Sequence, residues 1–224
     1  MILLKYAKRD SAVFLAHLNV LRHLERTLRR AEIPVKMSAG FHPHMNIFMA
    51  NPLGLGLASN CEYVAIDTDM SASEVLRRYN AHCIPGLEAS ACWSVTRNPN
   101  VAAAILSATY VARVEGISAH REALAAFFAQ RPLILSYHKN GKDVTTDITD
   151  RTYGYAVIGD TLSVTVGSGT KNVRPDKLAS ALKDYLGISQ EIDFIKTETF
   201  VAGDGCFENT DAWITANFCE VTHA

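Results

Sequence analysis

The side chains of this chain that could do chemistry gather in residues 17–44. A helix predicted over residues 18–32 carries cations on one side. The loop that follows, Gly40-Phe41-His42-Pro43-His44, carries two imidazoles. Guanidinium groups hold phosphate through parallel N–H donors, and imidazole titrates near neutral pH. This stretch therefore predicts a site for an anionic ligand.

The helix is two-sided when its residues are placed at about 100° each. One arc holds Leu18, Leu21, Leu24, Leu28 and Ala31. The roughly opposite arc holds Asn19, Arg22, His23, Arg26, Arg29 and Arg30. A solvated charged face is the ordinary explanation for such a helix. A phosphate-binding face is the alternative.

The histidine loop allows three interpretations. His42 and His44 could be solvated imidazoles of a surface turn. They could bind a metal, with His17 as the only nearby third ligand. His44 or His17 could instead act as a general acid or base. We expect no resident metal and no cofactor.

A second candidate for anion binding is the segment of residues 167–175, GSGTKNVRP, which joins a strand to a helix N-terminus and carries Lys171 and Arg174. Free backbone N–H groups and the helix dipole favour an anion at such a place. The G-K-[ST] ending of a Walker A loop is missing. A flexible connecting loop is the alternative.

Composition indicates an ordinary globular protein. The 224 residues are 48% hydrophobic and 20% charged, with a net charge of −1. Residues 1–50 hold eight Lys/Arg against three Asp/Glu, so a local basic region exists on a nearly neutral chain. The five cysteines form no C-x-x-C pair, and no apolar run has the length of a membrane span. We expect a soluble, cytoplasmic protein.

Periodicity and turn signals predict strand, helix, strand pair, helix and strand in residues 2–95, and a similar order in residues 109–201. Ser71-x-x-Glu74 predicts a helix start, Asn140-Gly141 and Gly159-Asp160 predict turns, and Pro175 with Gly187 bounds a helix. The predicted fold is α+β. It consists of two tandem ferredoxin-like (βαββαβ) units, with antiparallel sheets and helices on one face. The expected domains are residues 1–100 and 101–202, followed by a tail, 203–224.

Three segments carry a further signal: F-L-A-H-L-N-x-x-R-x-x-E-R-x-L-R-R-A-x-I-P-V, then S-x-G-F-H-P-H, and then P-L-G followed later by E-Y. Together they resemble the radical-SAM-linked family, whose members are encoded beside, or fused to, a radical SAM enzyme. The resemblance implies a radical SAM protein as partner. The residues that fit the family pattern are His17, Arg22, Glu25, Arg26, Arg29, Arg30, Gly40, Phe41, Pro43 and His44, whereas Asn19, His42 and Met45-Asn46 depart from it.

The expected function is that of a non-enzymatic accessory module, which presents RNA or another phosphorylated ligand to a radical SAM partner. The four arginines of the helix would contact phosphates, with Lys171 and Arg174 as a second contact. A protein–protein scaffold is the first alternative. An RNA endonuclease-like enzyme that uses His44 with Arg22 is the second. The architecture is also similar to that of pseudouridine synthases, but residues 33–66 contain no Asp for that chemistry.

Overall fold

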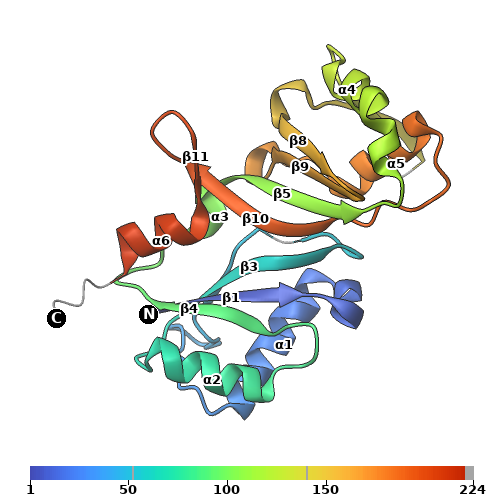
Figure 1. The fold of residues 1–224 in the computed structure, drawn as a ribbon. Helices are drawn as coiled ribbons and strands as arrows, with labels where there is room; N and C mark the ends of the chain where they lie inside the picture. Colours follow the sequence, from blue (N-terminus) through green and yellow to red (C-terminus); the bar gives the residue numbers. More distant parts are fainter. Residues whose placement is uncertain (52, 140, 220–224) are drawn as a thin grey trace. The chain divides into compact units, whose positions relative to one another are not determined.

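The computed structural model describes residues 1–51, 53–139 and 141–219 (Figure 1). Two compact units divide the chain: unit 1 contains Met1–Ile105 and Phe200–Ala224, and unit 2 contains Leu106–Thr199. The fold is α+β with a large, mostly antiparallel sheet, as predicted in this coarse form. The tandem ferredoxin-like arrangement is not confirmed. Among the described residues the sheet has nine strands and includes a parallel pair, and a two-stranded hairpin stands apart from it.

The sheet of unit 1 is built on β1 (Ile2–Lys8), which lies between β4 (Ala89–Ser94) and β3 (Ala58–Ile66). Both pairings are antiparallel, and β2 (Ile47–Met49) pairs antiparallel with the end of β3. The register sets Ile2 opposite Ile66. Because β1 is covered on both faces, its residues are buried at every position except Lys5, which is half-buried, instead of alternating between buried and exposed.

Helices cover both faces of this sheet (Figure 1). On one face, Ile2, Leu4 and Tyr6 share a core with α1 (His17–Arg30) and α2 (Ala72–His82). On the other, Leu3 and Tyr63 pack with α3 (Val101–Ala104) and α6 (Thr210–Phe218). Helices were expected on one face only, so α6 on the second face was not predicted. This helix is apolar on several sides, and it lacks the helical period by which a sequence pattern reveals a helix.

Helix α1 buries Leu24, Leu28 and, at its C-terminal end, Ala31 of the predicted apolar arc, but the buried arc is shifted away from Leu18. Val20, Leu24, Thr27 and Leu28 are buried, whereas the side chain of Leu18 is 64% exposed. Leu18 lies about 120° from Leu24 on the helical wheel, at the edge of the predicted apolar arc. The contact with the sheet is centred further round, toward Val20. Leu18 consequently shares the outer surface of the helix with the arginines.

Unit 2 has the strand order β10-β5-β9-β8, formed by β10 (Ile195–Ala202), β5 (Ile105–Arg113), β9 (Thr161–Gly167) and β8 (Thr152–Ile158). Along β10 the chain leaves unit 2 and re-enters unit 1. Helices α4 (Arg121–Ala129) and α5 (Pro175–Leu186) share one core with these strands. The separate hairpin is β6 (Ile134–Lys139) with β7 (Lys142–Asp147). Short 3-10 turns are η1 (Asp10–Phe14), η2 (Ile117–His120), η3 (Thr149–Arg151) and η4 (Gly169–Lys171).

Most local signals are confirmed. The Ser71 hydroxyl accepts a hydrogen bond from the Glu74 N–H, Pro175 begins α5, and Gly187 ends it in the left-handed region. Gly159-Asp160 joins β8 to β9, whereas Asn140 lies outside the described residues. Of the strand pair predicted between the first two helices, residues 34–38 contribute only an isolated Met37–Met45 bridge. In the tail, for which no element was predicted, lie β11 (Phe207–Asn209) and α6.

Candidate anion-binding surface

The outer face of α1 presents three unpaired guanidinium groups. Arg22, Arg26 and Arg29 are exposed, and none of their side chains forms a hydrogen bond or ion pair with another described residue. At about 1.5 Å per residue, Arg22 and Arg26 are separated by roughly 6 Å along the axis, and Arg26 and Arg29 by roughly 4.5 Å. Asn19 is exposed at the first turn of the same helix. The structure thus brings four of the predicted ligand-binding residues onto one helix.

Arg30 differs from its three neighbours, because its guanidinium group is already in use. Its Nη2 atom donates to the carbonyl of His82 at 2.8 Å and to Thr27 Oγ1 at 3.2 Å. The first bond joins the end of α1 to the end of α2. Arg30 is therefore a structural link between the two helices as well as an exposed cation.

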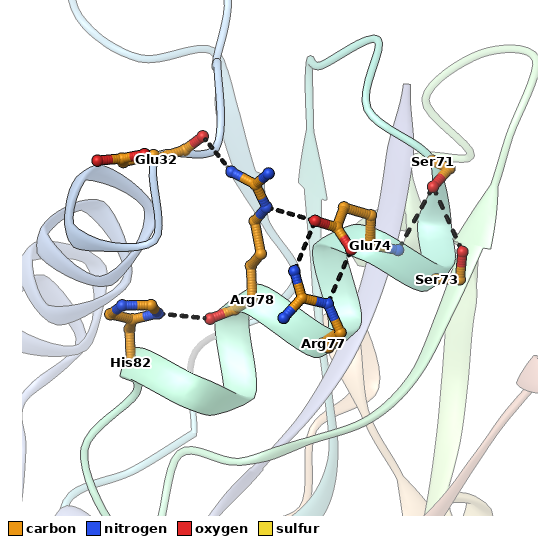
Figure 2. Close-up of polar contacts among 7 residues, drawn as sticks. All are labelled: Glu32, Ser71, Ser73, Glu74, Arg77, Arg78 and His82. Carbon is orange, nitrogen blue, oxygen red and sulfur yellow. Dashed lines mark hydrogen bonds and ion pairs between the residues drawn. The ribbon is translucent and has the colours of Figure 1, made fainter.

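The two arginines of α2 in the same unit differ from those of α1, because their guanidinium groups are paired with a carboxylate. Figure 2 shows the Glu74 carboxylate between Arg77 and Arg78, with N–O distances of 2.6–2.8 Å. The hydrogen bonds from Arg77 and Arg78 lower the pKa of Glu74 to about 2. Arg78 also reaches the carbonyl of Glu32 at 3.3 Å, and His82 folds back onto the carbonyl of Arg78. Neither arginine of α2 has the freedom of those on α1.

The histidine loop is a short hairpin with a stiff stem. Ser38 N donates to the carbonyl of His44 at 2.7 Å, His44 N donates to Ser38 Oγ at 3.0 Å, and Ser38 Oγ lies 2.8 Å from His44 Nδ1. At the tip, Gly40 has φ +123°, a value that favours glycine. His42 and His44 are exposed, and the Phe41 side chain is 102% exposed. The stem holds His44 in place, and the tip presents Phe41 to solvent.

His17 and the histidine loop are attached at different places along the sheet of unit 1. His17 lines a hollow together with Tyr6 and Lys8, at the end of β1. The loop is attached at the other end of the strand pair, where the Lys36 N–H donates to the carbonyl of Asp67, just beyond the Ile2–Ile66 pair. In the described part of the chain no three His, Cys, Asp or Glu side chains are grouped to hold a metal ion, so the structure does not bring His17 and the loop histidines together as a metal site.

The hollow that His17 lines includes polar residues that were not among the sequence candidates. Its cavity volume is about 10 Å³, far below that of small-molecule pockets. Lys8, Asn51 and Glu62 line it, and Lys8 Nζ donates to the carbonyl of Gly54 at 3.2 Å. Burial, reinforced by Glu62, raises the pKa of Tyr6 well above its ordinary value, so its phenol stays protonated. Strand alternation was the sequence signal that could have identified Glu62, because it places this residue on the same side of the strand as the apolar Val64 and Ile66.

The second predicted contact, in unit 2, has its charges partly satisfied. Arg174 donates two hydrogen bonds to the Asp176 carboxylate, from Nε at 3.1 Å and from Nη2 at 2.8 Å. That carboxylate lies in the first turn of α5 and competes with any added anion there. Lys171 is exposed, and the Val173 N–H donates to the carbonyl of Gly167. The loop itself is tight, because a Cβ on Gly167 would lie 2.4 Å from the Lys171 carbonyl oxygen.

Comparison with known protein families assigns the chain to one of them. Residues 1–175 match a family described as an uncharacterized protein conserved in bacteria (DUF2344). The chain belongs to this family. The match contains α1, the histidine loop and Arg174. A comparison with curated proteins finds no match. Within the described ranges, no helix of this DUF2344 member has both the length and the apolar character needed to cross a membrane.

Proposed function

We propose that this DUF2344 protein is a non-enzymatic module that binds RNA, or another ligand with several phosphates, along the outer face of α1. One observation carries the proposal: Arg22, Arg26 and Arg29 are exposed on a single helix and have no anionic partner among the described residues. Unpaired guanidinium groups at regular spacing suit a ligand with repeated negative charges. The hollow beside His17 is too small to supply a competing small-molecule site.

Charge distribution supports the same proposal. Residues 1–50, which contain α1, hold eight Lys/Arg and three Asp/Glu within a chain of net charge −1. Of those acidic residues, only Glu25 belongs to α1, and it forms no ion pair with any described residue. The surface therefore attracts an anion locally, while the protein as a whole has little field to hold one nonspecifically.

The resemblance to radical-SAM-linked proteins adds a partner to the proposal. In this function the module holds the ligand, and a radical SAM protein supplies the reaction. The chain's own cysteines support this division. Cys61 and Cys92 lie in separate strands, Cys206 is exposed in a loop, and the described residues contain no cluster-forming group. Co-purification with the radical SAM protein from the native bacterium tests this part, and a module recovered without it under low salt would contradict it.

The ligand part is tested by replacing arginines in matched pairs. Arg22→Ala/Arg26→Ala removes two unpaired cations from α1, and Arg113→Ala/Arg151→Ala removes two from unit 2. The side chains of these four residues form no hydrogen bond or ion pair with a described residue. We expect the α1 pair alone to weaken RNA binding, measured by fluorescence anisotropy at low salt. Equal loss in both variants would show that only total charge matters and would remove the site from α1.

A protein–protein scaffold is the second candidate, and the histidine loop favours it. Phe41 stands fully exposed on a stem held by three Ser38–His44 contacts, as anchor residues of protein interfaces do. In that function Phe41→Ala would abolish co-purification of the partner and leave RNA binding unchanged.

A further inference from the structure

Large apolar side chains stand exposed where the arginine row of α1 begins. Phe14 is 72% exposed, Leu18 64% and Leu55 67%. A backbone bond from Gly56 N to the carbonyl of Val13, at 2.8 Å, holds the loop of Leu55 beside η1, which ends at Phe14. Leu18 then lies one helical turn before Arg22. Single exposed apolar residues are ordinary, but three at the end of an unpaired cationic row form a mixed surface.

A surface that combines apolar side chains with cations selects among the anionic ligands that the cations alone would bind. A polyanion without rings, such as polyphosphate, has nothing for Phe14 or Leu18 to contact. A double helix also offers little, because its bases are stacked within it and its edges lie in grooves. A single strand exposes the flat faces of its bases beside its phosphates, and aromatic side chains next to cations are the usual means of binding it.

We propose that the RNA bound by α1 is single-stranded, and that Phe14 stacks on one of its bases while Arg22 and Arg26 hold the adjoining phosphates. This inference rests on the function proposed above and specifies its ligand. Leu18 lies beside the stacked base and excludes water from it. Leu55 closes the other side of the apolar area.

The decisive variant is Phe14→Ala, with Phe14→Trp as its conservative counterpart. Phe14 is exposed, so neither change should disturb the fold, which circular dichroism checks. Ile158→Ala serves as the matched control, because Ile158 is a 78% exposed apolar residue of unit 2. The probes are a labelled single-stranded oligoribonucleotide, the same strand annealed to its complement, inorganic polyphosphate, and polyglutamate.

We expect Phe14→Ala to weaken single-strand binding by about tenfold, as loss of one base stack does. Phe14→Trp should restore it, and Ile158→Ala should leave it unchanged. Binding of the duplex and of polyphosphate should be the same in all variants. An equal loss for polyphosphate, or no loss for the single strand, would overturn the stacking role of Phe14 while leaving the arginine function standing.

Two further outcomes separate this inference from the function beneath it. If polyglutamate binds as tightly as the single strand and loses the same factor in Phe14→Ala, the surface serves an acidic protein, and the RNA inference is wrong. If Arg22→Ala/Arg26→Ala changes no probe at all, the proposed function fails together with the inference.

Discussion

Asp211 is expected to hold α6 onto the sheet of unit 1, and its removal should measurably destabilise that unit. Its two carboxylate oxygens accept hydrogen bonds from Lys5 Nζ at 2.5 Å and from the Tyr63 hydroxyl at 2.6 Å. Tyr63 is almost fully buried. A hydrogen bond to a charged group contributes about 1.5–3 kcal/mol, and a part-exposed ion pair adds roughly 0.2–1 kcal/mol. We therefore expect Asp211→Ala to lower the free energy of unfolding by about 2–3 kcal/mol.

The assay can report on unit 1 alone. Both tryptophans of the chain, Trp93 in β4 and Trp213 in α6, belong to this unit. Urea unfolding followed by tryptophan fluorescence should show a lower midpoint in Asp211→Ala. Asp204→Ala, the same change on an exposed loop where the carboxylate has no described partner, should stay within about 0.5 kcal/mol of the parent. Equal midpoints for the two variants would refute the docking role of Asp211.

Three further outcomes are expected. Three phosphate contacts on single-stranded RNA predict a slope of about −2 for log K against log salt, and Arg26→Ala should reduce it to about −1.4, which anisotropy titrations at several salt concentrations measure. Because Arg77 and its neighbour lower the pKa of Glu74 from 4.5 to about 2, the stability that Glu74 adds is complete above pH 4.5 and is lost as the pH falls toward 2. Thermal melts of Glu74→Gln should consequently vary less with pH across that window than those of the parent. Gly86 has φ +85°, and a Cβ there would lie 2.3 Å from the Arg9 carbonyl oxygen. Gly86→Ala should thus cost about 2 kcal/mol or more in urea unfolding, whereas Gly205→Ala, in the same unit and with φ +74° in open space, should cost about 1 kcal/mol.

Local signals predicted the elements of the fold better than their arrangement. Ser71 and Pro175 mark helix starts because capping and a fixed φ depend on a few neighbouring residues. The capping box is only half formed, since Glu74 turns to the arginines of its own helix instead of returning to Ser71. Strand order and the return of α6 to unit 1 depend on contacts between distant segments, such as Lys5 with Asp211, and no periodicity encodes these.

The sequence predicted which residues of α1 carry the positive charges, but it could not predict which of these charges stay unpaired. Arg22 and Arg26 are exposed on one face because helical spacing fixes their direction. Whether a cation is free depends on its neighbours: Arg30 reaches His82, a residue far away in the sequence. A helical wheel could not predict the exposure of Leu18 either. Which edge of the apolar arc of α1 is buried depends on how the helix packs on the sheet.

The return of the chain to unit 1 sets an order of events during synthesis. Strands β1 to β4 leave the ribosome early, but Asp211, which clasps Lys5 and Tyr63, follows only after the roughly 90 residues of unit 2. At translation rates of about 5–20 residues per second, the nascent sheet waits on the order of 5–20 s with the face that α6 will cover still wet. Unit 2 therefore has time to fold before unit 1 is finished, and a stalled or prematurely ended message would leave an apolar surface for chaperones to shield.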